Sequence, residues 1–501
     1  MDRLDWIRKW ADYTPNKIAL TSFERNETYS YAQLDTYADR LIDRFVDIGL
    51  SEGDRVAVLS EHCLEYIVLF VACQRMGLML VPLNFRFSNS ELARLIKDCT
   101  PSLMVVSDSQ KDKLPTLDIS DIKVLSREVI REIYMNPIGV CQRDLPIKEE
   151  NPVFIFYTSG TTGAPKGVLY TNKMMFWNSL NTSMQLGITY RDSTINSLPP
   201  YHTSGWNIFV TPLLHKGGHI CMVEKFDPEK VLRLLSIYDT TLFMALPTML
   251  LMMQKSPVFK EVELSNLRYI ISGGETVPSS MVSYWKEEKG ILIRPGYGLT
   301  EAGPSITSLH HNMILTKPNS IGKPNFYLEL KILNKNGEQA KTNEIGELCI
   351  KGEVVTPGYW NNSVKTKSKI KNGWLHTGDF AHRDEDGFLY IKGRKNDMYI
   401  SGGENIYPQE IEMHLEQIKE VKKAVVLSVE DEKWGQCGLA FVAKMEGSNL
   451  KVETIKNYLD QTLVSFKHPR SIFILDEIPL TSLSKVSRKK LLKYLKTISQ
   501  E

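Results

Sequence analysis

The chain has 501 residues, of which 42% are hydrophobic and 24% are charged, and its 61 basic residues nearly balance its 59 acidic ones. This length exceeds the roughly 250 to 300 residues at which single cores stop growing, so we expect at least two domains. The composition excludes a disordered chain, and the balanced charge gives no overall field that would favour nucleic acid or an anionic membrane.

The cysteines and the chain start indicate the compartment. The seven cysteines are odd in number, scattered and never arranged as C-x-x-C, which argues against a disulfide framework or a zinc site. The first residues carry charges where a signal peptide would have its apolar segment, and no apolar run reaches the roughly 20 residues of a membrane span. We therefore expect a cytoplasmic protein without a transmembrane segment.

Short β-branched runs alternate with amphipathic stretches through the first half of the chain. The expected strands are 55–59, 103–106, 153–157, 194–197, 219–223 and 267–272. The expected helices include 31–45 and 228–235, where apolar residues recur at spacings of three and four. This alternation predicts an α/β fold with largely parallel sheets.

After about residue 325 the pattern changes to closely spaced strands with glycine turns. The expected strands are 328–333, 347–351 and 388–392, which together predict a small barrel-like β subdomain. From Gly393 onward helices and strands alternate again: 408–419 and 452–463 as helices, and 424–429, 439–444 and 472–475 as strands. We expect a large N-terminal domain, residues 1–394, and a small α+β C-terminal domain, residues 395–501.

The stretch "YTSGTTGAPKG", residues 157–167, directly follows the apolar run 153–156. Backbone amides in a glycine-rich turn after a strand can cradle phosphate oxygens, hydroxyl side chains add donors, and Lys166 adds a charge. An ordinary surface loop is the alternative. The stretch lacks the Gly-Lys-Ser/Thr ending of a P-loop, which argues against a kinase or a P-loop NTPase.

The same stretch closely resembles the phosphate-binding loop of the adenylate-forming superfamily, which includes acyl-CoA synthetases, peptide-synthetase adenylation domains and firefly luciferase. Four more motifs follow in the order of that family: "GYGLTE" (296–301), "HTGD" (376–379), "GRKNDMYISGGENIYPQEIE" (393–412) and "PLTSLSKVSRKKL" (479–491). The chain is identified as a member of this superfamily, with an AMP-forming acyl-CoA synthetase or fatty acid–CoA ligase as the implied type.

The resemblance implies a role for each motif residue. In the second motif Tyr297 stacks on adenine, Thr300 binds the α-phosphate and Glu301 holds Mg²⁺, a hard cation that prefers oxygen ligands. Asp379 accepts hydrogen bonds from the ribose hydroxyls, and Arg394 reaches the ribose and phosphate. The loop residues implied to bind the phosphates of ATP are Thr158, Ser159, Gly160, Thr161, Thr162, Gly163 and Lys166. Further residues implied at the ATP or CoA sites are Gly274, Glu275, Gly296, Gly298, Gly402, Gly403 and Asn405.

By the same resemblance, Lys485 is the catalytic lysine, acting with Thr300 and His202 to form an acyl-adenylate and pyrophosphate. The small domain then turns about the hinge residue Asn396 and brings Gly402 and Gly403 to the site, where CoA takes the acyl group. The family usually has Asp or Lys at the hinge, and Gly rather than Ser484 before the catalytic lysine. Paired glycines leave room for a pantetheine arm, although a helix N-terminal turn before Pro408 would also explain them.

The acid is indicated by "LPPYHTSGWNIF", residues 198–209, which resembles the acyl-pocket motif of the family. His202 stands where peptide-synthetase domains place an Asp for the substrate ammonium, which disfavours an amino acid. Trp206 resembles the residue that gates the acyl tunnel of long-chain synthetases, with a core tryptophan as the alternative. Gly298 is also expected beside the acyl group, and the Met-rich run 242–253 could line a tunnel or belong to the core.

We expect a medium- or long-chain fatty acid as first choice and an aromatic acid as second. The expected partners are therefore a small carboxylic acid, ATP and CoA, with no nucleic acid. An acyl carrier protein is the alternative to CoA as acceptor of the acyl group. A homodimer is kept as an alternative to a monomer. From other classes, a non-catalytic nucleotide-binding homologue and a luciferase-like oxygenase are kept as alternatives.

The Lys485→Ala variant should lose adenylate formation while it keeps thioester formation from supplied acyl-AMP, because only the first step needs the lysine between carboxylate and α-phosphate. Pyrophosphate release measures the first step, and acyl-CoA formation from acyl-AMP measures the second. Equal loss of both steps would contradict the two-conformation assignment.

Overall fold

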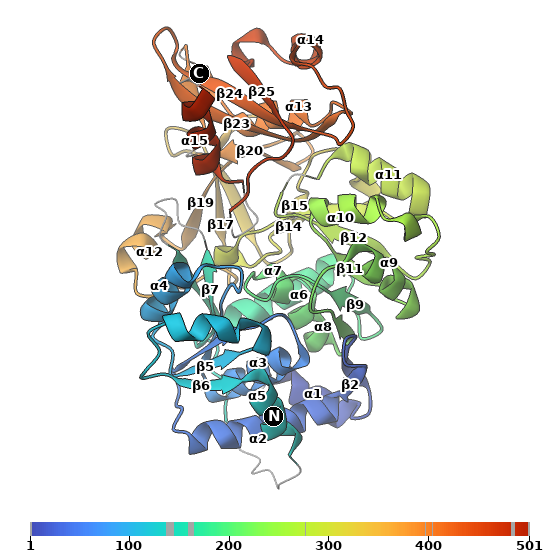
Figure 1. Ribbon diagram of the computed structural model, residues 1–501, viewed down its shortest axis with the longest axis vertical. Coiled ribbons are helices and arrows are strands. Elements are labelled where there is room, and N and C mark those ends of the chain that lie inside the picture. Colours follow the sequence, from blue (N-terminus) through green and yellow to red (C-terminus); the bar gives the residue numbers. More distant parts are fainter. Residues whose placement is uncertain are drawn as a thin grey trace.

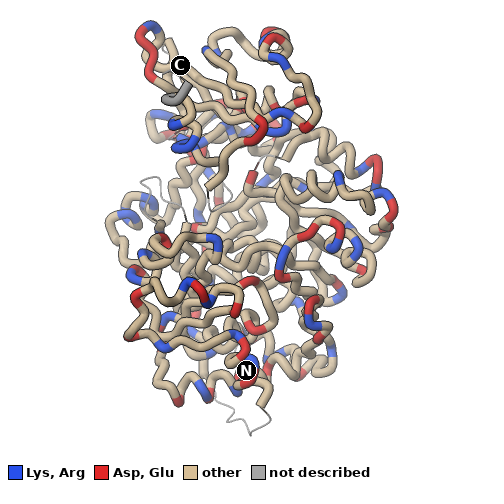
Figure 2. Tube along the Cα trace, in the orientation of Figure 1, with Lys and Arg blue, Asp and Glu red and all other residues tan. Residues whose placement is uncertain are grey.

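The computed structural model describes residues 3–136, 145–158, 165–275, 277–395, 397–402, 404–481 and 486–498 (Figure 1). Four sheets organise this part of the chain. Figure 1 shows the last of them, in orange and red, forming a small C-terminal domain at one end of a larger body. Basic and acidic residues are interspersed along the trace (Figure 2), in keeping with the near-neutral balance of the sequence.

The six-stranded sheet carries the glycine-rich stretch. Its strand order is β6-β5-β3-β4-β7-β8, parallel except for the antiparallel pair β7–β8. Its strands are β3 (Arg55–Leu59), β4 (Met79–Pro82), β5 (Leu103–Val106), β6 (Lys123–Ser126), β7 (Pro152–Thr158) and β8 (Lys166–Thr171). The strands expected at 55–59, 103–106 and 153–157 are confirmed.

The nine-stranded sheet carries the second motif. Its order is β15-β14-β13-β12-β11-β9-β10-β1-β2, with parallel pairs in the centre and antiparallel pairs at both ends. Its strands are β1 (Ile18–Ser22), β2 (Glu27–Ser30), β9 (Ser193–Asn196), β10 (His219–Met222), β11 (Leu242–Met244), β12 (Tyr269–Ser272), β13 (Ile293–Tyr297), β14 (Thr307–Ser308) and β15 (Lys323–Pro324). The three strands expected here are confirmed to within two residues.

Helices cover both parallel sheets. They are α1 (Trp6–Tyr13), α2 (Tyr31–Asp47), α3 (Leu64–Met76), α4 (Asn89–Cys99), α5 (Arg127–Met135), α6 (Asn172–Leu186), α7 (Ser204–Asn207), α8 (Val210–Lys216), α9 (Pro228–Ile237), α10 (Pro247–Gln254) and α11 (Ser279–Lys289), with 3-10 turns η1 (Asp108–Thr116), η2 (Pro257–Phe259), η3 (Thr300–Ala302) and η4 (His311–Met313). Helix α3 is buried almost along its whole length and contacts β4 and β7 of one sheet and β1 of the other. An all-round apolar helix of this kind joins the two sheets through one continuous core.

An antiparallel five-stranded sheet follows, as the glycine-turn pattern predicts. It contains β16 (Glu329–Leu333), β17 (Gly346–Lys351), β18 (Ile370–Lys371), β19 (Trp374–Arg383) and β20 (Leu389–Arg394), with α12 (Ser363–Lys369) before β18. The long strand β19 pairs with β17, β18 and β20 and is absent from the sequence prediction. The "HTGD" segment lacks the apolar pattern by which a strand is predicted, because the polar residues Thr377 and Asp379 occupy buried positions that apolar residues normally hold.

The small C-terminal domain is built on a sheet of β21 (Tyr399–Ser401), β22 (Glu404–Ile406), β23 (Val421–Asp431), β24 (Gly435–Lys444) and β25 (Ser471–Leu475). Its helices are α13 (Pro408–Leu415), α14 (Val452–Thr462) and α15 (Arg488–Ile498), with a 3-10 turn η5 (Ser465–Lys467). All five elements expected here are present. The first helix is shorter than predicted, because the chain leaves the helix after Leu415 and turns into β23.

The Glu412 carboxylate gives this domain a pH-dependent contact. The Val426 amide of β23 donates to Glu412 Oε1 at 2.8 Å, so the carboxylate of α13 is held against the sheet. Burial, with the nearby Glu416 charge as a smaller cause, raises the pKa of Glu412 to about 7, although the Val426 hydrogen bond acts in the opposite direction. The folded domain therefore binds a proton that the unfolded chain releases near pH 4.5.

We expect the protonated Glu412 to contribute its full stabilisation below about pH 4.5. As pH rises from there to about 7, the free energy of unfolding of the domain should fall by up to about 3 kcal/mol, because the buried carboxyl must then ionise. The Glu412→Gln variant keeps the acceptor oxygen without the charge, so its stability should fall less between pH 5 and 8 than that of the unmodified protein. Hydrogen exchange of β23 amides measures this, with Glu453→Gln on the exposed surface of α14 as control. An unchanged pH slope in Glu412→Gln would contradict the assignment.

Candidate nucleotide and acyl site

The β7–β8 hairpin places the two ends of the glycine-rich stretch beside each other. Thr158 and Lys166 are paired across the hairpin, and β7 is anchored because Val153 to Phe156 are buried in the core. The expected phosphate-binding residues Ser159, Gly160, Thr161, Thr162 and Gly163 lie outside the described residues. The anchored strand thus explains the apolar run before the polar stretch: it fixes both ends of the candidate loop.

The second motif begins at the end of β13 and continues into η3. A Cβ on Gly298 would lie 2.0 Å from the Pro304 carbonyl oxygen, so the close backbone approach requires glycine. In η3, Glu301 accepts a hydrogen bond from the Tyr359 hydroxyl at 2.9 Å. Tyr359 belongs to none of the five motifs, and an aromatic residue after Gly358 gives no distinct signal, so sequence reasoning missed it.

Asp379 is the centre of the best-defined polar cluster in the site. It lies on β19, directly across the ladder from Arg394 on β20, whose Nε lies 2.7 Å from Asp379 Oδ1. The Tyr297 hydroxyl donates to Asp379 Oδ2 at 2.5 Å. Burial raises the pKa of Asp379, while the Arg394 charge and the Tyr297 hydrogen bond oppose that rise. Three expected nucleotide-binding residues from three motifs are therefore in contact.

The β19 residue before Asp379 also contacts the start of the proposed hinge. Gly378 has φ +79°, which favours glycine, and its carbonyl accepts from the Lys395 amide at 2.8 Å. Asn396, the expected hinge residue, lies outside the described residues. On its far side, Asp397 forms a two-point ion pair with Arg488, with both N–O distances 2.7 Å.

That ion pair joins the fourth and fifth motifs. The Ser487 amide donates to the Pro479 carbonyl at 2.8 Å, and Leu480 bridges to Val486, so both flanks of the last motif lie side by side. Lys485, the expected catalytic lysine, lies between these flanks but outside the described residues, as does Ser484. The structure therefore places the described flanks of the fifth motif next to the hinge motif.

Gly402, the first glycine of the hinge-motif pair, lies at the end of the β21 strand of a β-hairpin. Gly402 has φ +57° and follows β21, and Asn405 pairs with Ile400 across the hairpin; Gly403 lies outside the described residues. The Gly402 amide donates to the Trp434 carbonyl at 2.9 Å, and a Cβ there would meet the Trp434 ring. Strand β22 lies between Gly402 and α13, so Gly402 belongs to the hairpin and not to the turn that begins the helix at Pro408.

Gly274 and Glu275 follow strand β12, which lies beside the β13 strand of the second motif. Gly274 has φ +81°, and the Glu275 carboxylate lies 3.6 Å from Lys423 Nζ of the C-terminal domain. This ion pair links the two parts of the protein in the arrangement seen here.

Trp206 lies within an aromatic cluster. The side chain is fully buried, its Nε1 donates to the Pro200 carbonyl at 2.8 Å, and the rings of His62, Tyr66, Phe70 and Phe154 surround it at centroid distances of 4.9 to 5.6 Å. His202 lies in the preceding turn, and its ring is 4.9 Å from that of Tyr201. The buried methionines Met244, Met249 and Met253 belong to the main core, as the plain core alternative predicts, and Met252 is exposed.

The site offers the carboxylate ligand that one Mg²⁺ ion would need if the ion binds together with the phosphates of ATP. Among the described residues, no group of three or more His, Cys, Asp and Glu side chains could hold a metal ion. Mg²⁺ typically takes one or two carboxylates together with substrate phosphates and water, so Glu301 alone fits that pattern. In the same described part, no helix has the length and apolar character to cross a membrane.

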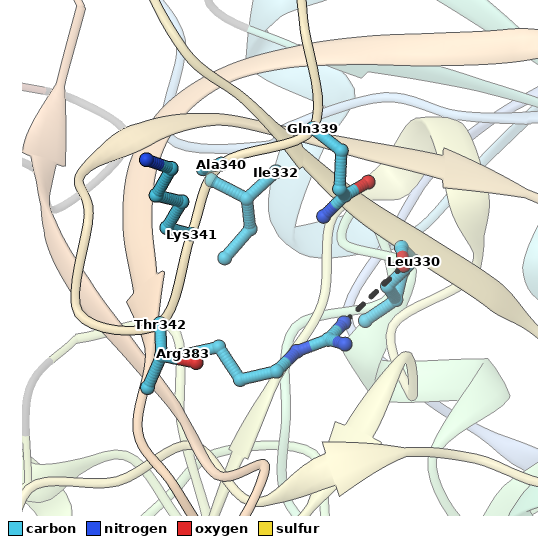
Figure 3. Close-up of a pocket in the computed structure, with 7 residues that line it drawn as sticks. All are labelled: Leu330, Ile332, Gln339, Ala340, Lys341, Thr342 and Arg383. Atoms are coloured by element: carbon cyan, nitrogen blue, oxygen red, sulfur yellow. Dashed lines mark hydrogen bonds between the residues drawn. The ribbon is translucent and has the colours of Figure 1, made fainter.

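A separate cavity of about 310 Å³ lies in the antiparallel sheet (Figure 3). Ile332, Lys341 and Arg383 line it, and Arg383 donates to the Leu330 carbonyl at 3.3 Å. It shares no residue with the five motifs. The candidate active site is therefore the convergence of motifs around Asp379 and not this cavity.

Comparison with known proteins agrees with the convergence of the five motifs. Residues 7–360 match the AMP-binding enzyme family, and residues 410–485 match the AMP-binding enzyme C-terminal domain. Similar curated proteins are the indoleacetate–CoA ligase of Aromatoleum aromaticum (31% identity, 97% of each chain) and the feruloyl-CoA synthase of Amycolatopsis sp. (31%, 96% of each). The 2-succinylbenzoate–CoA ligase of Geobacillus kaustophilus is 33% identical over 97% of each chain.

A solved structure shows the same overall arrangement. The o-succinylbenzoate CoA synthetase of Bacillus subtilis, in complex with its acyl-adenylate intermediate, has a TM-score of 0.87 and 28% identity over 97% of each chain. The chain therefore belongs to the AMP-binding enzyme family, the adenylate-forming superfamily of the acyl-CoA synthetases, and is an AMP-forming acid–thiol ligase.

Proposed function

We propose that this enzyme activates an aromatic carboxylic acid with ATP and transfers the acyl group to CoA. The observation that carries the proposal is the set of full-length relatives at 31–33% identity, which are named for indoleacetate, ferulate and 2-succinylbenzoate. These names favour the aromatic acid over the fatty acid that the sequence put first. The reaction itself is the ATP-dependent formation of an acyl-AMP followed by thioester formation.

In the first step the residues hold the nucleotide and leave the nucleophilic attack to the carboxylate. Asp379 accepts hydrogen bonds from the ribose hydroxyls. Its two carboxylate oxygens can accept these bonds in addition to the contacts with Arg394 and Tyr297, because each oxygen has two lone pairs. Lys485 bridges the carboxylate and the α-phosphate, and Thr300 binds the phosphate oxygens. Bound by Glu301, Mg²⁺ would neutralise phosphate charge. The acceleration comes from alignment and charge stabilisation.

In the second step the small domain, from residue 395 onward, turns about Asn396. Lys485 leaves the site, and the hairpin with Gly402 and Gly403 enters it. Arg394 is the last residue of strand β20, which pairs with β19, and the Lys395 amide that follows it donates to the Gly378 carbonyl of β19. In this proposal the large domain holds the nucleotide in both steps, and only the small domain moves.

The packing around Trp206 supports a compact, flat acid. The indole is held by a hydrogen bond and four surrounding rings, and moving it aside would open a gap in a close-packed core. A gate for a long alkyl chain needs a side chain that can move. We therefore assign Trp206 to the rigid wall near the acyl end of the site and His202 to its entrance turn.

A panel of carboxylic acids tests the proposal: indoleacetate, ferulate and 2-succinylbenzoate against decanoate and palmitate, each with ATP and Mg²⁺. We expect kcat/KM for the best aromatic acid to exceed that for either fatty acid by at least about tenfold, a difference of about 1.4 kcal/mol. Pyrophosphate release measures activation, and thioester formation is followed with and without CoA.

A fatty acid as the best substrate would contradict the aromatic assignment, and acyl-AMP that CoA does not consume would contradict CoA as acceptor. In that second case, a carrier-protein thiol is the next acceptor to test. Size-exclusion chromatography with light scattering of the same preparation measures whether the enzyme is a monomer or a homodimer.

The Tyr297→Phe variant should raise KM for ATP by about tenfold with a smaller change in kcat, because Asp379 loses one of the two donors that orient it. Steady-state kinetics at saturating acid measures both constants. Tyr390→Phe is the matched control: its hydroxyl donates to Asp384 in the same sheet, at 3.3 Å, away from the motifs. A KM for ATP that stays within twofold in Tyr297→Phe would contradict the role assigned to the contact.

A further inference from the structure

Helix α12 carries three lysines beside the glycine-rich hairpin. The chain just before it runs along β8: the Trp360 amide donates to the Gly167 carbonyl at 2.7 Å, and the Leu169 amide donates to the Gly358 carbonyl at 3.1 Å. Lys365 and Lys369, four residues apart, share one face of the helix and are half-buried, whereas Lys367 is exposed. Figure 1 shows α12 on the edge of the large domain, and α12 contacts β18 and β19.

The Lys369 ammonium is held against the "HTGD" segment of β19. It donates to the carbonyls of His376 and Thr377 at 3.1 and 3.2 Å, and a Cβ on Gly378 would lie 3.1 Å from it. An ammonium has three donors, so two hydrogen bonds leave one for a ligand. The charge thus stands next to Asp379, the expected ribose contact.

The Lys365 ammonium lies near Lys166 at the start of β8. Burial lowers the pKa of Lys166, and the neighbouring Lys365 and Lys369 charges lower it further, while Glu301 acts in the opposite direction. The pKa of Lys369 is lowered by burial and then by Lys365, again opposed by Glu301. Three cationic side chains therefore converge on the side of the site that holds the one expected Mg²⁺ ligand.

This convergence is unfavourable without an anion. None of the three ammonium groups forms an ion pair with a carboxylate among the described residues, although 61 basic and 59 acidic residues would allow many pairs. Like charges that are partly removed from water repel one another more strongly than at the surface. A ligand with several negative charges would relieve that repulsion at all three lysines.

We propose that Lys365 and Lys369 are polyphosphate-binding residues that, with Lys166, bind the β- and γ-phosphates of ATP and then the pyrophosphate product. The assignment rests on the adenylation step of the proposed function and adds two residues outside the five motifs. The lysines lie between the ends of the glycine-rich loop and the ribose contact Asp379, which is the span that a triphosphate attached to that ribose must cover.

The test compares binding of ATP, pyrophosphate and AMP to Lys365→Met, Lys369→Met and the control Lys367→Met by calorimetry. Loss of Lys365 or Lys369 should weaken ATP and pyrophosphate by about tenfold each, the scale of one charge-assisted hydrogen bond. AMP lacks the outer phosphates, so its affinity should stay within about twofold. The control removes the same charge from the same helix and should change none of the three.

Unchanged ATP affinity in both variants would overturn the proposal, and so would an equal loss of AMP affinity, which would indicate a structural role. Lys365→Met removes no side-chain hydrogen bond within the described residues, so it carries the test if Lys369→Met folds poorly. Lys369→Arg keeps the charge and should retain ATP affinity. No carboxylic acid or CoA is present, so a wrong assignment of the acid leaves the outcome unaffected.

Discussion

The ion pair between Asp379 and Arg394 is the contact on which the arrangement of the site depends. It is a cross-strand pair of the antiparallel sheet, so the pairing of β19 with β20 places it without any loop. Tyr297 comes to it from the nine-stranded sheet, and the Lys395 amide, immediately after Arg394, donates to the Gly378 carbonyl beside it. One buried carboxylate therefore connects the second motif, the "HTGD" segment and the start of the hinge motif.

Each strand that the sequence predicted is present, because apolar residues alternate or run continuously there, as in β3, β5 and β7. The prediction failed where polar residues occupy buried strand positions: Asp379 looked like a turn residue, yet it lies inside the ten-residue strand β19. Family resemblance supplied the site residues that periodicity could not. Neither periodicity nor family resemblance identified Tyr359 and the lysines of α12, because only the folded chain brings them close to Glu301 and Lys166.

The role proposed for Trp206 rests on packing and not on motif spacing. A tryptophan at position 206 is compatible with a gate or a wall, and sequence spacing cannot separate these roles. Its hydrogen bond and the four rings around it favour a wall. Of the two alternatives for the Met-rich run, the core alternative holds for Met244, Met249 and Met253, where an unbranched, adaptable side chain fills irregular space.

The Glu275–Lys423 ion pair bears on how freely the two parts of the enzyme can change their relative orientation. Both side chains are about one third exposed, at 37% and 33%, so the attraction is screened by salt and contributes little. Breaking this ion pair would therefore cost little free energy. Two orientations of similar free energy would let each substrate select the one it binds, so the order of ligand arrival, rather than a rigid latch, would set the conformation of the enzyme.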